Sequence, residues 1–400
     1  MNMRFLNRAS LLLMVMSLSG CSSLSSVNES VTDSLTGLFE EKDTSEPPRA
    51  LSKFSSSVSV RQLWSSQIGS NSKKLYVKLQ PAVDGDRVYA AGIKGNVSAY
   101  DVKSGRLLWQ TDTAARLRGG PGVGSGLVLI GTADAELIAL DAQTGKEKWR
   151  ALASSEILAA PSAADGVAVA RSIDGRIFGF SAEDGKRLWI HDSSVPVLTL
   201  RGTSAAVLFS GGVIAGLANG KMIALRLKDG ALIWETRIAI PRGRSELERI
   251  VDIDADPIVA DGVIHVATYQ GNVATIALEN GRGLWNRKMS THAGIGADVK
   301  SLYVTDANSE IWSLERRSGS SFWKNDKLRA RKVTAPVAVG EYVVVGDLAG
   351  YVHFLKRDSG AFAARINVGK SPIIAAPVVS GNTVFVSNSA GQLTAIRVGG

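Results

Sequence analysis

Short apolar runs alternate with pairs of turn-forming residues along most of the chain. In one stretch, apolar runs cover residues 157–163, 167–171, 176–181 and 186–190, and the pairs Asp165-Gly166, Asp174-Gly175 and Asp184-Gly185 separate them. Glycine accepts the positive φ that tight hairpin turns require. The pattern therefore predicts four short antiparallel strands joined by tight turns.

The same pattern recurs along the chain. With residues 175–189 as the template, copies that end in tryptophan occur at 95–109, 135–149, 220–234, 271–285 and 309–323. A further copy at 350–364 ends in alanine, and the last copy begins at Gly391. Four antiparallel strands repeated about every 40 residues are typical of a β-propeller blade.

Seven of the eight tryptophans occupy one position of this repeat, and Trp312 is the exception. We expect the seven indole rings to pack flat against the neighbouring blade, since each can bury a large apolar area there. Asp101 and Asp141 lie four residues before turn glycines, and we expect their carboxylates to cap those turns.

The two ends of the repeat region complement each other. The last copy supplies three strands between Ile373 and Arg397, and the segment around Trp64 is a fourth strand with no strands before it. Pairing them would leave no free sheet edge. The sequence therefore predicts an all-β fold, an eight-bladed β-propeller with four antiparallel strands per blade, over residues 60–400.

The first residues have the pattern of a secretory signal peptide. Arg4 and Arg8 precede an apolar run at 9–18, which is too short to span a bilayer, and small residues lead to the only cysteine, Cys21. We interpret residues 1–20 as a signal peptide. The cysteine position resembles the lipobox of bacterial lipoproteins, and the alternative is an ordinary signal peptide with a chance cysteine.

The lipoprotein resemblance implies that Cys21 is lipidated and becomes the first residue after cleavage. Ser22, in place of aspartate, implies the outer membrane as the destination. Residues 21–59 are rich in serine and charged residues, and such a composition buries too little apolar surface to fold. We expect a flexible tether there, behind a lipid anchor.

Composition removes several classes of function. One cysteine excludes a disulfide scaffold and zinc sites built from several thiolates. The net charge of +9 over 400 residues does not favour nucleic acid as a partner. The four histidines, His191, His265, His292 and His353, are scattered without metal-ligand spacing. We find no catalytic motif and predict no catalytic, cofactor or metal site.

The motif of Ala139, Leu140, Asp141, Thr144, Gly145, Lys146 and Trp149 resembles the tryptophan-docking repeat of quinoprotein dehydrogenases. Two families carry this repeat: eight-bladed enzymes that bind pyrroloquinoline quinone and calcium, and BamB, the propeller lipoprotein of the outer-membrane β-barrel assembly (BAM) machinery. The quinone enzymes have a vicinal disulfide and long insertions between blades. The single cysteine and the nearly uninterrupted repeats favour the BamB family.

The BamB resemblance implies a non-enzymatic scaffold on the periplasmic face of the outer membrane, lipid-anchored in its inner leaflet. Such a scaffold binds the periplasmic POTRA domains of BamA within the BAM complex and assists delivery and insertion of unfolded β-barrel proteins. Two alternatives stay open: a periplasmic enzyme or sensor that binds a quinone or small ligand in the central channel, and a structural lipoprotein that binds peptidoglycan or another envelope protein.

Two intervals between a repeat tryptophan and the next inner strand are long, from Trp189 to Ala206 and from Trp234 to Pro257; the interval from Trp64 to Pro81 is also long. Long loops on a rigid scaffold often carry binding residues. The BamB resemblance assigns contact with BamA to residues that correspond to Leu198, Leu200, Arg201, Asp252 and Asp254. The alternative is that Leu198 and Leu200 begin a buried inner strand.

A basic run also lies between two later blades and contains Lys324, Lys327, Arg329, Arg331 and Lys332. We interpret it as a solvated loop, with contact to an acidic partner or to lipid A phosphates as the alternative.

Overall fold

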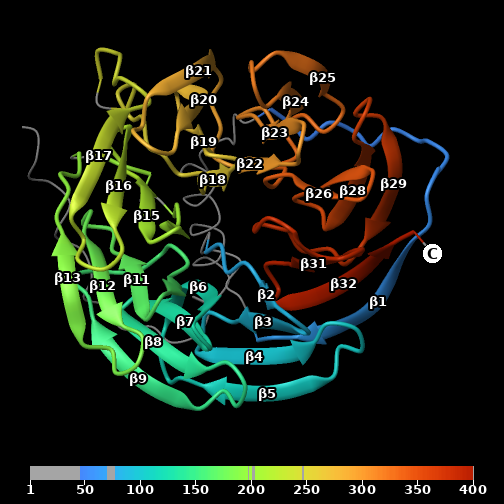
Figure 1. Ribbon diagram of the computed structural model, residues 1–400. Helices are drawn as coiled ribbons and strands as arrows, with labels where there is room; N and C mark the ends of the chain where they lie inside the picture. The colour runs from blue at the N-terminus through green and yellow to red at the C-terminus, as the bar shows by residue number, and fades with distance from the viewer. Residues whose placement is uncertain (1–45, 70–76, 197, 201–202, 246, 400) are drawn as a thin grey trace, which may run out of the picture. The chain divides into compact units, whose positions relative to one another are not determined.

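The computed structural model describes residues 46–69, 77–196, 198–200, 203–245 and 247–399. The chain divides into two compact units, residues 1–47 and 48–400, and residues 46 and 47 are the described part of the first unit. The described ranges contain 32 strands and no helix, so none of them holds a helix long and apolar enough to cross a membrane. The strands form eight sheets of four antiparallel strands, which confirms the predicted eight-bladed propeller (Figure 1).

The first four blades follow the chain order, from the inner to the outer strand. Blade 1 consists of β2 (Ala82–Asp84), β3 (Arg87–Ala91), β4 (Asn96–Asp101) and β5 (Leu107–Asp112). Blade 2 consists of β6 (Leu117–Gly124), β7 (Leu127–Thr132), β8 (Glu136–Asp141) and β9 (Glu147–Leu152). Blade 3 consists of β10 (Ser162–Ala164), β11 (Val167–Arg171), β12 (Ile177–Ser181) and β13 (Arg187–His191). Blade 4 consists of β14 (Val207–Phe209), β15 (Gly212–Gly216), β16 (Lys221–Arg226) and β17 (Leu232–Arg237).

The next three blades continue in the same way, and the last blade joins the two ends of the ring. Blade 5 consists of β18 (Ile258–Ala260), β19 (Val263–Ala267), β20 (Asn272–Ala277) and β21 (Gly283–Lys288). Blade 6 consists of β22 (Gly294–Ala297), β23 (Ser301–Thr305), β24 (Ile311–Glu315) and β25 (Ser321–Asn325). Blade 7 consists of β26 (Val337–Val339), β27 (Tyr342–Gly346), β28 (Tyr351–Lys356) and β29 (Phe362–Asn367). Blade 8 consists of β30 (Val378–Ser380), β31 (Thr383–Ser387), β32 (Gln392–Val398) and β1 (Val60–Gln67).

The ring closes where sequence predicts it. Strand β1 pairs with β32 from Val60 opposite Val398 to Gln67 opposite Gln392. The register skips one residue beside Trp64, as it does beside Trp149 in blade 2. A bulge at this position bends the outer strand and increases its twist. Blade 8 therefore repeats the geometry of the other blades although its strands come from opposite ends of the unit.

The inner strand of blade 3 is shorter than its apolar run predicts. In blade 3 the expected strand at 157–163 is reduced to β10, which covers Ser162–Ala164. The reason is that Ile157, although buried, donates its N–H to the carbonyl of Thr132 in blade 2 and not to its own sheet. Ile157 is therefore apolar because it packs against the preceding blade, and not because it belongs to a strand.

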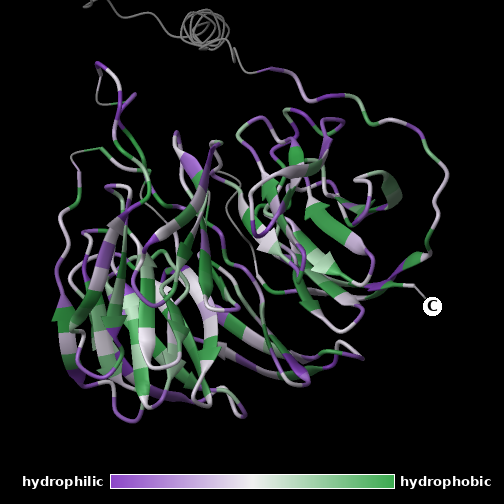
Figure 2. Ribbon diagram, turned by 45° about the horizontal axis from the view of Figure 1, so that its top comes forward, coloured by the Kyte–Doolittle hydropathy of each residue, from purple (hydrophilic) through white to green (hydrophobic). Residues whose placement is uncertain are grey.

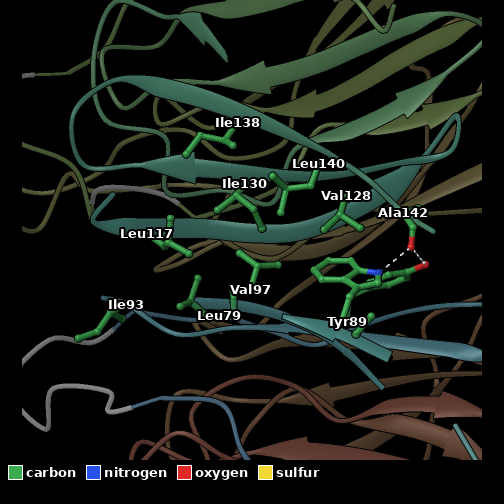
Figure 3. Packing of buried hydrophobic residues seen from close by; sticks show 13 residues of the cluster. Leu79, Tyr89, Ile93, Val97, Leu117, Val128, Ile130, Ile138, Leu140 and Ala142 are labelled. Atoms are coloured by element: carbon green, nitrogen blue, oxygen red, sulfur yellow. Dashed lines mark hydrogen bonds between the residues drawn. The ribbon is translucent and has the colours of Figure 1, made fainter. Parts of the chain in front are cut away.

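Each repeat tryptophan docks on the next blade, as predicted. The indole Nε1 of Trp109 donates to the carbonyl of Ala142 at 3.1 Å. The hydroxyl of Tyr89 donates to the same oxygen (Figure 3). Around them, apolar residues of blades 1 and 2 form one core cluster. The equivalent Nε1 bonds are those of Trp64 to Val102, Trp149 to Ala182, Trp189 to Leu227, Trp234 to Leu278, Trp285 to Arg316 and Trp323 to Arg357.

The turn glycine of the next blade lies under each docked ring. A Cβ on Gly145 would lie 2.4 Å from the ring of Trp109, and the φ of Gly145 is +71°. Both the left-handed backbone and the lack of space require glycine there. Asp141 accepts the N–H of Thr144 at 2.8 Å and Asp101 accepts that of Ser104 at 2.7 Å, so the predicted turn caps are confirmed.

The compact unit begins before residue 60, the start expected from sequence. Residues 48–59, which the sequence analysis assigned to the tether, lie against blades 6 and 7: Arg49 pairs with Asp326, and Phe54 stacks on Phe362 with ring centroids 5.2 Å apart. The composition of this segment is polar, but Leu51 and Phe54 find apolar partners on the propeller. Figure 2 shows the general rule, with hydrophobic residues concentrated in the strands and hydrophilic residues at the turns.

Candidate functional site

The long loops all lie at one end of the ring. Because each blade has four antiparallel strands, every connection from an outer strand to the next inner strand leaves the sheet at the same end. We call this end the loop face; it comprises the connections between the outer strand of one blade and the inner strand of the next. The three long intervals noted in the sequence are the connections β1–β2, β13–β14 and β17–β18.

Leu198 and Leu200 lie in the β13–β14 loop, and their side chains are exposed by 42% and 37%. Strand β14 begins only at Val207. The alternative that these leucines start a buried inner strand is therefore wrong. Arg201, which the resemblance grouped with them, lies outside the described residues, as does Cys21.

Asp252 is not a surface residue. Its exposed fraction is 0%, and burial raises its pKa to about 6, an effect that the positive charge of Arg171 opposes. A side chain without exposed surface cannot touch a partner in this conformation. The expectation that Asp252 contacts BamA directly is therefore not supported by its position, and Asp252 instead forms part of the interior beneath the loops.

Asp254 holds two long loops together. One of its oxygens, Oδ1, accepts the backbone N–H of Thr203 at 2.6 Å and the hydroxyl of Thr203 at 3.0 Å. Its side chain is only 11% exposed. Both aspartates named by the resemblance thus lie under the loop face and present little surface themselves, and Asp254 positions Thr203.

Further hydrogen bonds extend this connection. The hydroxyl of Ser204 donates to the carbonyl of Ala255 at 3.1 Å, and the N–H of Ala205 donates to Asp256 Oδ1 at 2.6 Å. Residues 203–205 therefore run beside residues 254–256. The β13–β14 and β17–β18 loops, on either side of blade 4, form one platform.

Lys78, from the third long interval, also reaches this platform and was missed in the sequence. Its Nζ lies 3.4 Å from Asp254 Oδ2, 3.5 Å from the hydroxyl of Thr203 and 3.3 Å from the carbonyl of His292. The only signal for it was the length of the interval between Trp64 and Pro81.

The β17–β18 loop adds two exposed apolar residues that sequence reasoning also missed. Ile240 is 58% exposed and Leu247 is 67% exposed. Glu248 accepts the N–H of Arg244 at 2.6 Å and so organises the tip of the loop. The sequence did contain a signal for this surface. Ile240 and Leu247 are apolar residues in a charged loop, outside the regular strands, where packing within a sheet does not account for them.

The basic run between blades 6 and 7 is largely paired within the propeller. Glu310 accepts Lys324 at 2.6 Å and Arg329 at 3.4 Å, and the buried Asp347 accepts Arg331 at 2.8 Å. Lys327 lies 3.3 Å from Asp326. These ion pairs give the run a role within the fold, so an external anion is not needed to explain it.

Two of the four histidines are fully buried and hydrogen bonded. Nδ1 of His265 lies 2.7 Å from the hydroxyl oxygen of Thr275, and its Nε2 accepts a hydrogen bond from Arg316 Nε at 3.1 Å. Burial and the charge of Arg316 lower the pKa of His265 to about 4. His353 lies 2.9 Å from Asp347. In the described part of the chain, no group of three His, Cys, Asp or Glu residues is placed to hold a metal ion.

Comparison with known proteins separates the two families that share this repeat. A family model described as outer membrane protein assembly factor BamB matches residues 53–116 and 93–325. The chain is 49% identical to the outer membrane protein assembly factor BamB of Pseudomonas aeruginosa over 352 residues, 88% of this chain and 93% of the relative. It is 48% identical to the protein of that name from Alkalilimnicola ehrlichii over 348 residues, 87% and 91% of the two chains.

Solved structures agree on the fold. BamB from Moraxella catarrhalis superimposes with a TM-score of 0.78 at 27% identity, over 85% of this chain and all of that one. Quinohemoprotein alcohol dehydrogenase from Comamonas testosteroni superimposes with a TM-score of 0.69, but at 15% identity, over 84% of this chain and 76% of that one, and shows the shared propeller alone. The chain belongs to the family of the outer membrane protein assembly factor BamB.

Proposed function

We propose that this protein is a non-enzymatic scaffold of outer-membrane protein assembly that binds the periplasmic POTRA domains of BamA through its loop face. Family membership supports the general role. The observation that carries the specific proposal is the exposure of Leu198 and Leu200 in a loop that is hydrogen bonded to its neighbour. The scaffold would assist delivery and insertion of β-barrel proteins within the BAM complex.

The chemistry of the platform fits a protein partner. Binding energy in protein interfaces concentrates in a few apolar or arginine side chains held in a fixed position and surrounded by polar groups. Leu198 and Leu200 supply apolar surface, and Arg201 follows them directly in the sequence. Asp254 contributes by fixing the loops from beneath, and Asp252 lies buried under them.

A lipid anchor is part of the same proposal. Lipidation of Cys21 would tie the chain to the outer membrane from its periplasmic side, since more than one acyl chain gives stable anchoring. Residues 22–47 between the cysteine and the propeller are rich in serine.

The proposal is tested by co-purification from detergent-solubilised envelopes with the full-length, lipidated chain. We expect Leu200→Glu to reduce the recovered BamA at least tenfold, the loss of one central interface residue worth about 1.4 kcal/mol or more, and Arg201→Ala to reduce it as well. The matched control is Leu107→Glu on β5, a leucine of similar exposure (47%) on an outer strand. Normal recovery by both loop variants would remove the loop face from the interface.

A further inference from the structure

Lys78 connects parts of the propeller that lie on opposite sides of its axis. It precedes blade 1, and its neighbours Thr203, Asp254 and His292 belong to the loops that enter blades 4, 5 and 6. In a ring of eight, blade 5 faces blade 1 across the centre (Figure 1). The side chain of Lys78 therefore reaches across the axial end of the ring at the loop face.

We propose that Lys78 is a positioning residue for the partner-binding platform: its ammonium group clamps Asp254 and Thr203 and thereby fixes the loop that carries Leu198 and Leu200. The inference rests on the proposed function, because it assumes that these leucines are contact residues. It adds a third loop, far from the leucines in sequence, to the elements that determine binding.

Asp254 is well placed to transmit this effect. Its two carboxylate oxygens bind different groups. Oδ1 accepts hydrogen bonds from the backbone N–H and the hydroxyl of Thr203, and Oδ2 accepts one from the ammonium group of Lys78. The pair is mostly shielded, with Asp254 exposed by 11% and Lys78 by 34%. An ion pair with a hydrogen-bonded and shielded carboxylate is worth more than a pair on the open surface.

Local charge strengthens the argument. Three aspartates, at 252, 254 and 256, follow one another at every second position. Arg171 is a buried cation near them: burial lowers its pKa, and the charges of the three aspartates oppose that shift. The charge of Lys78, like that of Arg171, opposes the raising of the pKa of Asp256 by burial, so removal of Lys78 would leave the three carboxylates with less compensating positive charge. Like charges at short range repel, and the segment that carries Asp254 would lose its fixed position.

Leu200 lies three residues before Thr203. If Thr203 is held less firmly, Leu200 is therefore less ordered as well. A loop that must be ordered during binding lowers the affinity, because the entropy of ordering is lost at that step. Loss of a partly shielded ion pair of about 1 kcal/mol corresponds to about a fivefold loss of affinity. The contact residues themselves would be unchanged.

The test uses the full-length chain with three variants. Lys78→Met removes the charge and keeps an unbranched side chain that is one atom shorter, and Lys78→Arg keeps the charge. Lys370→Met is the matched control. Lys370 is an exposed lysine of the loop face between blades 7 and 8. Two quantities are measured: the recovery of BamA, and the hydrogen exchange of the Thr203 and Ala205 amides, which donate to Asp254 and Asp256.

We expect Lys78→Met to speed the exchange of both amides and to reduce recovery about fivefold, with Lys78→Arg close to the wild type and Lys370→Met without effect. Faster exchange with normal recovery, or unchanged exchange, overturns the positioning role. If Lys78→Met raises exchange throughout the propeller, Thr203→Val serves in its place, because it removes only the hydroxyl that bonds Asp254 and approaches Lys78.

Leu200→Glu in the same experiment separates this inference from the proposed function. If Leu200→Glu loses BamA and Lys78→Met does not, the loop face binds BamA and only the positioning role is wrong. If Leu200→Glu and Arg201→Ala both retain BamA, the loop face is not the binding surface and the proposed function itself fails, whatever the exchange of the Thr203 amide shows.

Discussion

Seven junctions between blades are built in one way, and the junction between blades 7 and 8 is built in another. At a regular junction, such as that between blades 2 and 3, Trp149 donates to Ala182 and covers the turn glycine Gly185, whose added Cβ would lie 2.7 Å from the ring. At the junction between blades 7 and 8, the tryptophan position is occupied by Ala364, which is fully buried.

The exceptional junction is sealed by the beginning of the propeller. Ser57 donates its N–H to the carbonyl of Ala363, and Gly399 donates to Ser59. Val58 and Val60 pack against the core shared by blades 7 and 8. In blade 8 the outer strand is β1, so no tight turn joins it to β32 and offers a glycine to an indole ring. The repeat therefore lacks its tryptophan at the one junction where the next blade has no tight turn, and no turn glycine, for an indole ring to cover.

The largest expected effect is at the closure. Deletion of residues 60–67, which form β1, removes one strand of blade 8 together with Trp64 and its docking on blade 1. We expect a loss of more than about 5 kcal/mol, which is comparable to the whole stability of many domains. Urea unfolding of the full-length variant measures it, with proteolysis of the propeller in envelopes as a second probe.

Deletion of residues 30–37, an equal length of the expected tether, is the control and should leave the urea midpoint unchanged. A β1 deletion variant that unfolds as cooperatively and at the same urea concentration as the wild type would show that the remaining strands close without β1.

The next effect compares a docked tryptophan of a regular junction with Phe54, an aromatic residue of the segment that leads into the closing strand β1. Trp149→Ala should cost about 4 kcal/mol, because it removes a ring that is 7% exposed and its hydrogen bond. Phe54→Ala should cost about 2 kcal/mol, since Phe54 is only partly buried and stacks on Phe362 with Arg365 lying 5.0 Å from its ring. Urea midpoints of both variants, compared at equal slope, measure the difference.

Equal losses for the two variants would contradict the expectation that the docked ring of Trp149 contributes more to stability than the ring of Phe54. A Phe54→Ala variant of wild-type stability would show that residues 48–56 lie on blade 7 without stabilising it.

The repeat made most of the fold predictable from sequence. Trp64 shares the tryptophan position with six other residues, and its pairing with the last blade followed from counting strands. The docking of residues 48–59 was not predictable, because a few apolar residues such as Leu51 and Phe54 in a polar segment do not reveal their partner.

The candidate site was only partly predictable. The long loops and the position of Leu198 and Leu200 outside the strands could be inferred from the spacing of the repeats. The burial of Asp252 could not, because an aspartate in a long loop is ordinarily exposed. Lys78 could not be identified either, since Thr203 and His292 are 125 and 214 residues away in sequence and no periodicity connects them.

The smallest expected effect is a difference in pH dependence between buried histidines of the two regions. His265 lies between blades 5 and 6, at a regular junction, and its pKa is about 4. His353, in blade 7, also has a lowered pKa through burial, but it is hydrogen bonded to Asp347, which favours its protonated form. The two histidines therefore differ in whether a carboxylate is bonded to the ring.

A histidine whose pKa is lower in the folded state than in the unfolded state binds its proton mainly after unfolding, so stability falls as the pH decreases from 6.5 towards 4. For His265 this amounts to about 1 kcal/mol between pH 7 and pH 5.5. We expect His265→Gln to flatten the pH dependence of the unfolding free energy by that amount, and His353→Gln to flatten it less. Comparing each variant with the wild type at every pH cancels groups that titrate in the opposite sense, such as Asp252 with its pKa of about 6. An equal or larger change for His353→Gln would mean that Asp347 does not favour the protonated ring.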